Sequence, residues 1–226
     1  MITPARRRGV EILDDANVDP DVRRRSLGDV ARSNRLLGGR RAARRAVRRV
    51  LSESKSASLL DVGSGLADIP EAIRRDAFAR GVAITTIGVD EALSLLTATR
   101  ACLDFAVCAS ATALPFADGA VDVVICSQLL HHFTDEDAVC VLREMHRVAR
   151  SAVVVADLRR SWIAAIGFWL VSWPLFFHRV TRHDGFISVL RGFTAADLRR
   201  LVTAATGRTP SVERHLGFRL TASWHT

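Results

Sequence analysis

The sequence predicts an α/β fold in which a mostly parallel sheet is covered by helices on both faces. Short apolar runs without polar alternation recur along the chain and are separated by amphipathic segments. Such runs are typical of strands buried on both faces, and the helical segments between them supply the crossovers that parallel strands require. The chain has 226 residues, of which 49% are apolar and 25% charged, so it can form a sizeable core and wholesale disorder is excluded.

The charge of the chain is concentrated at its N-terminal end. Residues 1–50 hold 14 arginines and six acidic side chains, whereas residues 51–226 are balanced, so the formal net charge of +8 belongs to the first fifty residues. Such a segment suits nucleic acid or an anionic membrane, or else it is the solvated face of a helix. The first residues lack the apolar stretch of a secretory signal, and the four cysteines show no framework spacing. We therefore expect a cytoplasmic protein with reduced thiols.

The segment before the first strand is predicted to be a helical cap. Residues 1–25 show no periodicity and predict a loose lead-in. From about residue 26 to residue 51, apolar side chains recur at helical spacing, and Gly38-Gly39 divides this run into two helices. A polar linker follows at 51–58. The expected division is an N-terminal cap over 1–55 and a larger domain over 56–226.

The larger domain alternates between strand and helix in the order that a parallel sheet requires. Buried strands are predicted over 58–62, 82–90, 105–108, 121–126 and 151–157. Helices are predicted over 67–81, 91–103 and 135–150, the first with Gly81 at its C-terminal end.

One segment after the fifth strand departs from this alternation. Residues 161–177 carry no charge, which is at the short limit for crossing a bilayer, and Gly167, Ser172 and Pro174 weaken that interpretation. Ligands of α/β sheets bind beyond the carboxyl ends of the strands, so we expect residues 159–193 to form a lid over an apolar substrate. The predicted substrate contacts in this lid are Trp169, Phe176 and Arg182. A core helix and an interfacial membrane anchor are the alternatives.

The first predicted strand leads into a glycine-containing loop, Asp61-Val62-Gly63-Ser64-Gly65-Leu66-Ala67-Asp68. Glycines permit a sharp turn and close approach of a ligand to the backbone. A dinucleotide would place its pyrophosphate at the following helix N-terminus, where Asp68 replaces the third glycine and would repel it. S-adenosylmethionine (SAM) has no phosphate and carries a cationic sulfonium, so the acidic loop favours SAM over NAD.

The second predicted strand ends in Gly88-Val89-Asp90. An acidic side chain at this point can accept hydrogen bonds from both ribose hydroxyls of an adenosine cofactor. Alone, Asp90 would be a helix N-cap at least as often. Together with the glycine loop, at the end of a neighbouring strand, the ribose role is the better interpretation.

At this point the sequence resembles the class I SAM-dependent methyltransferases. The resemblance rests on LLDVGSGLADIP, then GVDEA, then SATALPFADGAVDVVICSQLLHHFTDEDAVCVLREMHRVAR, and it covers about residues 58–158. The sequence is most similar to the C-methyltransferases of ubiquinone and menaquinone biosynthesis and to small-molecule methyltransferases of bacterial natural-product clusters. It implies a Rossmann-like, mostly parallel sheet with an antiparallel final strand. The upstream SNRLLGGRRAARR also resembles a segment of the quinone enzymes, which implies a pocket role for Asn34.

The resemblance also implies the residues that hold SAM. The methionine portion would face Asp61 and the Gly63-Ser64-Gly65 turn, and the ribose would face Asp90 with Glu91 beside it. Ser110 and Ala111 would flank the adenine, and Ser127 with Gln128 would line the cofactor floor. Many relatives have Asp where this chain has Ser110, and a serine hydroxyl accepts more weakly from the adenine amino group.

Methyl transfer from SAM depends mainly on positioning, with a general base where the acceptor is a hydroxyl or an activated carbon acid. Histidine is the preferred base near neutral pH. His131 and His132 directly follow the fourth strand, and a structural role is the alternative for both. His183, followed by Asp184, is a third candidate, supported by similar His-Asp pairs in natural-product methyltransferases. His178 and His183 are spaced poorly for metal ligands, and we expect no metal.

We therefore expect a SAM-dependent methyltransferase that acts on a lipophilic, aromatic or phenolic small molecule such as a polyketide or quinone-like product. S-adenosylhomocysteine would be the cofactor product. The first alternative is a membrane-surface enzyme that methylates a lipid quinone, with peripheral membrane contact. The second is a nucleic-acid methyltransferase or binder, which the absence of an Asn/Asp-Pro-Pro-aromatic signature and of tyrosine disfavours. The sequence leaves the oligomeric state open.

Overall fold

The computed structural model describes residues 3–7, 9–15, 17–51 and 55–226, so Arg8 and residues 52–54 of the expected linker lie outside the described part. Its helices are η1 Ile12–Asp14, α1 Pro20–Leu36, α2 Gly39–Val50, α3 Asp68–Phe78, α4 Leu93–Thr99, η2 Leu130–His132, α5 Asp135–Val148, α6 Trp162–Ser172, α7 Arg179–Arg191 and α8 Ala195–Thr206. Its strands are β1 Ser56–Val62, β2 Ala83–Asp90, β3 Phe105–Cys108, β4 Val121–Ser127, β5 Ala149–Leu158, β6 Ser211–His215 and β7 Arg219–His225.

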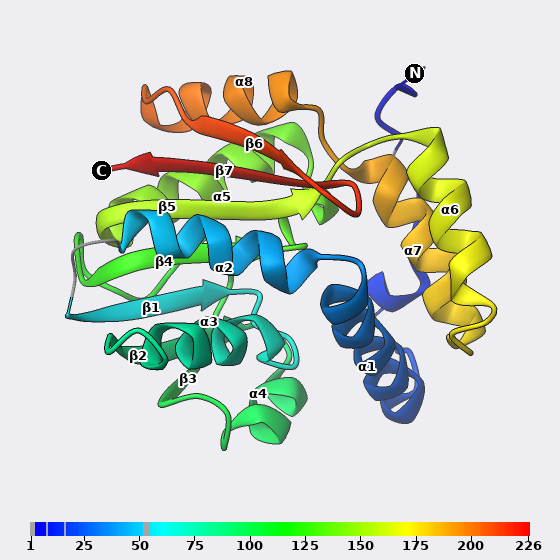
Figure 1. Ribbon diagram of the computed structural model, residues 1–226, viewed down its shortest axis with the longest axis horizontal. Helices are drawn as coiled ribbons and strands as arrows, with labels where there is room; N and C mark the ends of the chain where they lie inside the picture. The colour runs from blue at the N-terminus through cyan, green and yellow to red at the C-terminus, as the bar shows by residue number, and fades with distance from the viewer. Residues whose placement is uncertain (1–2, 8, 16, 52–54) are drawn as a thin grey trace.

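The strands form one seven-stranded sheet in the order β3-β2-β1-β4-β5-β7-β6 (Figure 1). The neighbouring pairs among β1 to β5 are parallel, and β7 runs antiparallel between β5 and β6. The predicted fold class, with its antiparallel final strand, is confirmed. All five predicted strands are present. The runs of β1, β4 and β5 are buried along most of their length, whereas the edge strand β3 is largely exposed.

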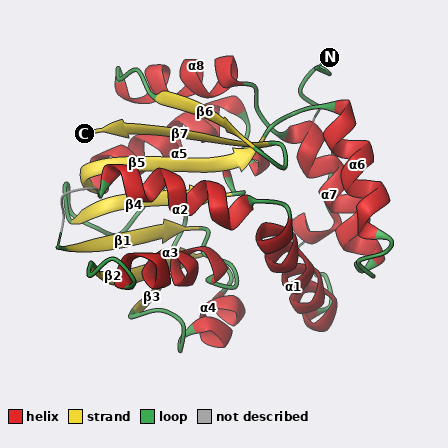
Figure 2. Cartoon of the chain, viewed as in Figure 1, coloured by secondary structure: helices red, strands yellow, loops and turns green. Residues whose placement is uncertain are grey.

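Helices cover both faces of the sheet (Figure 2). One apolar core joins α2 and α3 to side chains of the central strands, such as Leu59, Ile125 and Val154. The other core joins α5 and α8 to the opposite side chains of the same strands, such as Leu60, Val124 and Val153. The alternation along each strand therefore divides its side chains between two cores, and the loops at the carboxyl ends remain available for a site.

The N-terminal region is more ordered than the sequence predicts. Helix α1 begins at Pro20 and not near residue 26, because the Asp19 side chain accepts from the backbone N–H groups of Asp21 (2.8 Å) and Val22 (3.1 Å). The lead-in was expected to be loose, yet its described residues include a 3₁₀ turn, η1, whose preceding residue Glu11 is buried. Tertiary contacts, and not periodicity, hold this segment in place.

Helix α2 explains the arginine-rich run. The residues on its apolar side are buried against the sheet, in the core that α2 shares with α3, namely Ala42, Ala43, Ala46 and Val47. Arginines 41, 45, 48 and 49 lie on the exposed side. This arrangement is an amphipathic helix with a solvated cationic face.

Several element ends differ from the predicted ones. Helix α4 spans only Leu93–Thr99 within the predicted 91–103. Helix α5 ends at Val148, because the chain enters β5 at Ala149, two residues before the predicted strand. In the part of the chain that the structure describes, no helix has the length and apolarity needed to cross a membrane.

Candidate active site

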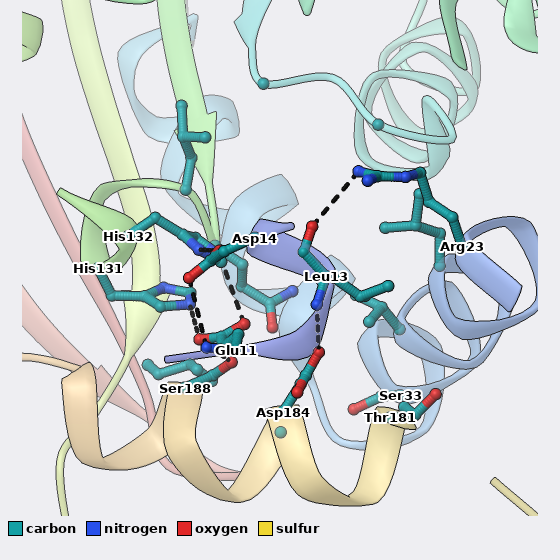
Figure 3. Close-up of a pocket in the computed structure, with 18 of the residues that line it drawn as sticks. Glu11, Leu13, Asp14, Arg23, Ser33, His131, His132, Thr181, Asp184 and Ser188 are labelled. Atoms are coloured by element: carbon teal, nitrogen blue, oxygen red, sulfur yellow. Dashed lines mark hydrogen bonds and ion pairs between the residues drawn. The ribbon is translucent and has the colours of Figure 1, made fainter. Parts of the chain in front are cut away.

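A cavity of about 430 Å³ lies beyond the carboxyl ends of the parallel strands (Figure 3). Its walls come from the glycine loop after β1, the end of β2, the loop after β4, helices α1 and α7, and the N-terminal segment. This is the position where α/β sheets of this kind bind ligands. The lining residues that the sequence predicts for the cofactor are Gly63, Gly65, Asp90, Glu91 and Gln128.

The glycine loop turns its backbone toward open space. The N–H groups of Gly63 and Ser64 donate to the Val89 carbonyl at 2.8 and 3.0 Å, which fixes the loop on β2. Gly63 has a φ of +71°, and a Cβ there would lie 2.8 Å from the Leu129 side chain. Gly65 has a φ of +51°, and no described atom lies within 4 Å of its Cβ position. A ligand can therefore approach the backbone at Gly65 without meeting a side chain.

Asp90 lies at the cavity wall with its orientation fixed. Its Oδ2 accepts from the Gly65 N–H and its Oδ1 from the Ala92 N–H, both at 2.9 Å. Each carboxylate oxygen retains a further lone pair, so Asp90 can still accept from the two hydroxyls of a ribose. Asp90 is thus not the N-cap residue of α4, which is Ala92.

A second carboxylate, Asp61, is buried beneath the glycine loop. Burial, followed by the charges of Asp68 and Asp90, raises the pKa of Asp61 well above its ordinary value. Its Oδ1 and the Ser64 hydroxyl make no hydrogen bond within the described residues. An uncompensated buried carboxylate beside an open backbone fits a cationic ligand such as the ammonium or sulfonium of SAM, and it does not fit a pyrophosphate.

We expect Asp61→Asn to stabilise the ligand-free protein near neutral pH. Since the folded-state pKa of Asp61 is raised, folding disfavours its ionised form, and stability falls as the pH rises from the unfolded value of 3.8 through the folded pKa. Each pKa unit corresponds to about 1.4 kcal/mol, or about 3–6 °C in Tm for a chain of this size. Thermal unfolding of both proteins across this pH range tests the sign, and a lower Tm for the variant at neutral pH would contradict it.

The floor of the cavity contains an arginine that the sequence analysis missed. Arg219, at the start of β7, is buried and donates through Nη1 to Gln128 Oε1 at 2.7 Å. Burial lowers the pKa of Arg219 to about 10. Gln128 also donates to Asn34 Oδ1. Asn34 therefore contacts a lining residue but does not line the cavity itself. No local motif marks Arg219, because β7 reaches the site only through its antiparallel pairing with β5.

Three further cofactor candidates, like Asp61 and Ser64, do not line the cavity. Ser127 ends β4, and Ala111 packs into the core on one face of the sheet. The Ser110 hydroxyl lies 2.9 Å from the Thr112 hydroxyl, in the loop after β3. Their predicted roles toward an adenine ring stay predictions.

His131 is the best-positioned base in the cavity. It follows β4, is buried, and lies with its Nδ1 2.7 Å from Asp157 Oδ1 at the end of β5. Burial would raise the pKa of Asp157, but the charge of His131 and its hydrogen bond outweigh burial and lower it. The other ring nitrogen, Nε2, makes no hydrogen bond within the described residues. Nδ1 can therefore donate to the carboxylate while Nε2 offers its lone pair to the cavity.

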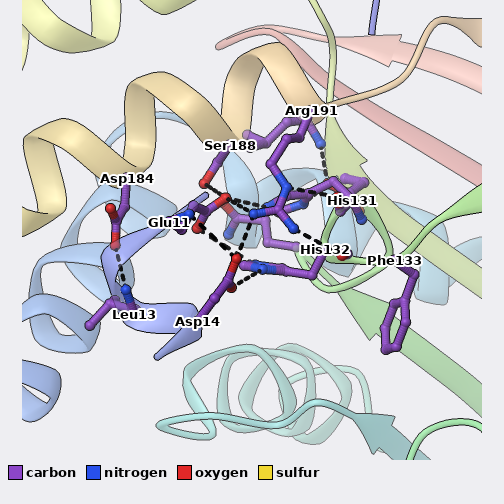
Figure 4. Close-up of polar contacts among 12 residues, drawn as sticks. Glu11, Leu13, Asp14, His131, His132, Phe133, Asp184, Ser188 and Arg191 are labelled. Atoms are coloured by element: carbon purple, nitrogen blue, oxygen red, sulfur yellow. Dashed lines mark hydrogen bonds and ion pairs between the residues drawn. The ribbon is translucent and has the colours of Figure 1, made fainter. Parts of the chain in front are cut away.

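The N-terminal strap, defined here as residues 9–15, closes the cavity over His131 and His132 (Figure 4). Asp184 of α7 accepts from the backbone N–H groups of Ile12 (2.8 Å) and Leu13 (3.0 Å). The Ser188 hydroxyl donates to Glu11 (2.8 Å), and Arg191 donates to Asp14 (2.7 Å). The strap was not predicted from the sequence, because so short a segment shows neither a helical nor a strand period.

The strap also determines the surroundings of the second histidine. His132 Nδ1 lies 3.0 Å from Asp14 Oδ1, and its ring is more exposed than that of His131. Burial alone would raise the pKa of Asp14, but hydrogen bonds from His132 and Arg191 lower it. Burial raises the pKa of Glu11, which lies between the two histidines. Glu11, His131 and His132 bring ligand-type atoms within 4.8 Å, yet Arg191 and Ser188 already donate to Glu11, which favours a hydrogen-bonded network over a metal centre.

Removing the Asp184 carboxylate should release the strap. Asp184→Ala deletes two hydrogen bonds to a charged acceptor, each worth about 1.5–3 kcal/mol, so we expect local opening to increase by about a hundredfold or more. The rate of tryptic cleavage after Arg7 measures this opening. His183→Ala is the matched control, because the exposed His183 ring contacts Asp184 and not the strap, so both hydrogen bonds from the strap to Asp184 remain. Equal cleavage rates in the two variants would contradict the strap assignment.

The structure places the other predicted residues outside the cavity. His183 does pair with Asp184, at 2.8 Å, but its side chain is 49% exposed and does not line the cavity. Trp169 and Phe176 lie on the outer side of the predicted lid, and Arg182 stacks over the Trp173 ring at 4.0 Å. Only Phe168 of the segment 161–177 lines the cavity. The apolar sequence could not reveal that α6 turns most of its large side chains outward.

The sheet order, the glycine loop and the acidic side chain after β2 together define the class I SAM-dependent methyltransferase architecture. Residues 60–156 match the family model described as a methyltransferase domain. None of the curated proteins compared with the chain is similar to it.

Solved structures share the fold at low sequence identity. A protein described as a methyltransferase from an antibiotic biosynthesis pathway of Anabaena variabilis is 17% identical (TM-score 0.53; 77% of this chain, 66% of that chain). An O-methyltransferase of Nostoc punctiforme is 14% identical (TM-score 0.58; 81% and 55%). The magnesium protoporphyrin IX methyltransferase of Synechocystis, solved with bound S-adenosylhomocysteine, is 14% identical (TM-score 0.61; 91% and 93%). The chain thus spans less than two thirds of the length of the first two.

Proposed function

We propose that the protein transfers the methyl group of SAM to a small lipophilic, aromatic acceptor that carries a hydroxyl or an acidic carbon. The observation that carries this proposal is the buried Nε2 of His131, which lies at the cavity wall without a hydrogen-bond partner among the described residues, with Glu11 Oε1 3.9 Å away, while Asp157 fixes the opposite side of the ring.

Asp90 and the Gly65 backbone would hold the adenosine portion of SAM, and Asp61 would face its cationic methionine end. When bound, SAM supplies a methyl group on a sulfonium, and an acceptor displaces that sulfur in line. The chain contributes the orientation of both reactants in a cavity whose wall includes Glu11, Leu13 and Asp14 of the strap.

His131 would accept the proton that the acceptor loses. The proton of the acceptor hydroxyl would move to Nε2 while the acceptor takes up the methyl group. Asp157 keeps Nδ1 protonated and stabilises the imidazolium that results. The released proton then returns to solvent when product leaves.

The acceptor side of the cavity favours an apolar molecule. Its lining includes the apolar side chains Leu13, Leu27, Val30, Leu95, Leu129, Phe133, Leu158, Phe168 and Val189. Polar side chains also line the cavity, and Glu11 and Asp14 lie beside the two histidines. The likeness to structures described as acting in antibiotic biosynthesis and on a protoporphyrin supports an organic acceptor of this class.

Thermal unfolding with excess S-adenosylhomocysteine tests the cofactor assignment. A ligand at a hundred times its dissociation constant adds about 2.7 kcal/mol of stability. For a domain of this size, we expect Tm to rise by about 5–10 °C. NAD is the control and should leave Tm unchanged. No rise with S-adenosylhomocysteine, or an equal rise with both ligands, would contradict the proposal.

One alternative has an observation in its favour. The exposed apolar side chains of α6 suit an enzyme that works at a membrane surface on a lipid quinone. The acceptor chemistry would be the same, and a quinone-like ring would occupy the same cavity.

A further inference from the structure

The outer side of α6 and of the turn that follows it is an exposed apolar face. It comprises seven side chains that are each at least 40% exposed, namely Ile163, Ile166, Trp169, Leu170, Val171, Trp173 and Phe176. These are half of the large apolar side chains exposed in the described part of the chain. Exposed apolar side chains scattered singly are ordinary, but a contiguous group of this kind marks an interaction surface. We call this group the α6 face.

The α6 face is a built part of the fold and not a poorly packed helix. The inner side of α6 packs on α7 through Ala164 and Ala165 in a small core with Leu158, Val189 and Leu190. Ser172 is buried and donates to the Trp169 carbonyl at 2.6 Å. In Figure 1, α6 lies on the outside of α7, at the edge of the molecule beyond the strand ends. The inner side is therefore satisfied, and only the outer side lacks a partner.

Arginines lie next to this face, and acidic side chains are absent from its sequence. From residue 158 to residue 183 the chain contains no Asp or Glu, whereas Arg179 and Arg182 follow the face directly; Arg160 is buried and paired with Asp197 at 3.0 Å and is not part of the rim. The Arg182 guanidinium lies over the Trp173 ring (4.0 Å), and Arg32 of the adjacent α1 lies over Phe177 (5.4 Å). Aromatic and aliphatic side chains rimmed by arginines are the composition of surfaces that bind the headgroup region of anionic membranes.

We propose that the α6 face is a peripheral docking site for an anionic lipid bilayer. The apolar side chains would enter the headgroup region, and the arginines would contact lipid phosphates. Helix α6 has 11 residues, too few to cross a hydrocarbon core of about 30 Å, so it would lie in the interface.

A second copy of this chain is a weaker fit to the same face. A symmetric contact would place the arginines of the two rims against each other, and the segment contains no carboxylate to neutralise them. A bilayer containing acidic lipids supplies that negative charge. The charge pattern therefore favours the membrane over a homodimer.

The location gives docking a consequence that rests on the proposed function. Phe168, on the same helix as the α6 face, lines the cavity. Docking would bring the cavity next to the bilayer, from which a lipophilic acceptor could enter. The docking itself requires no catalysis, and His131→Ala should bind vesicles as the unmodified protein does.

Co-sedimentation of the full chain with vesicles tests the proposal. We expect binding to vesicles of equal parts phosphatidylcholine and phosphatidylglycerol and weaker binding to phosphatidylcholine alone. Leu170→Ser combined with Trp173→Ser should lower partitioning by at least about tenfold, because each side chain loses its apolar burial. Arg179→Gln should lower partitioning on the anionic vesicles by about fivefold.

The matched pair Phe176→Ser and Phe78→Ser separates the α6 face from exposed apolar surface in general. Both phenylalanines are 82% exposed, but Phe78 ends α3 and lies outside the face. We expect only Phe176→Ser to weaken vesicle binding, while circular dichroism shows both variants folded. Equal partitioning of the two variants, or no binding of the unmodified protein to anionic vesicles, would overturn the proposal. A dimer that Leu170→Ser/Trp173→Ser converts to a monomer, without vesicle binding, would assign the face to a second copy instead.

Discussion

Replacing His131 with alanine should lower the methylation rate by about 10²–10⁴-fold while the affinity for S-adenosylhomocysteine stays unchanged. The Nε2 atom of His131 is buried at the cavity wall and makes no hydrogen bond within the described residues. No other described histidine of the cavity is both buried and oriented by a buried carboxylate. Asp157→Asn should also lower the rate strongly. The amide of Asn can donate a hydrogen bond to Nδ1, which favours the His131 tautomer that is protonated at Nε2, and this tautomer has no lone pair on Nε2 to accept the proton of the substrate. Single-turnover rates measured beside calorimetric binding of S-adenosylhomocysteine separate chemistry from cofactor affinity.

Two histidine variants serve as controls for this result. His183→Ala removes a ring with a carboxylate partner at a similar distance, 2.8 Å against 2.7 Å, but outside the cavity, and its turnover should match that of the unmodified protein. His132→Ala should have a smaller effect than His131→Ala, because the ring of His132 already contacts Asp14. Turnover that survives in His131→Ala and fails in His183→Ala would assign the base to the other histidine.

The second large effect is expected at Asp90. Asp90→Ala should weaken binding of S-adenosylhomocysteine by about a hundredfold or more, because two hydrogen bonds from ribose to a charged acceptor are each worth about 1.5–3 kcal/mol. The substitution also releases the Gly65 N–H, which Asp90 holds at 2.9 Å, so the glycine loop loses part of its orientation. Isothermal calorimetry measures the change in Kd. Asp90→Asn keeps one oxygen acceptor, so its Kd should lie between that of the unmodified protein and that of Asp90→Ala.

Asp104→Asn distinguishes a loss of affinity from a loss of stability. Its carboxylate also accepts a backbone hydrogen bond in the same sheet, from the Thr86 N–H at 2.7 Å, but it does not line the cavity. This variant should lower Tm and leave the Kd unchanged. A Kd for Asp90→Ala equal to that of Asp104→Asn would show that Asp90 acts only on the fold.

Local sequence signals identified the cofactor side of the site. The apolar runs marked β1 to β5, the glycines marked the turn after β1, and an acidic side chain marked the end of β2. These features are detectable because each one rests on a short stretch of chain with a fixed period or a fixed turn requirement. Gly63, Gly65, Asp90, Glu91 and Gln128 line the cavity, and their roles toward the cofactor stay predictions.

The acceptor side depended on contacts that span most of the chain. Ser188 and Glu11 are 177 positions apart, and Asp184 contacts a strap more than 170 positions away. Arg219 comes from the last strand, and His131 meets Asp157 only because β4 and β5 are neighbours in the sheet. No periodicity or motif encodes such pairings.

The sequence by itself determined the α/β class, the positions of the first five strands along the chain, the glycine loop and the cofactor that suits this loop. Tertiary structure alone decided which histidine is buried against a carboxylate, that a polar N-terminal segment closes the cavity, and that α6 turns Trp169 and Phe176 to solvent. The physical reason is that strands and tight turns follow from local backbone preferences and from burial on both faces. The orientation of an all-apolar helix does not follow in this way, because with no polar stripe only packing against α7 and the cavity determines which side is buried.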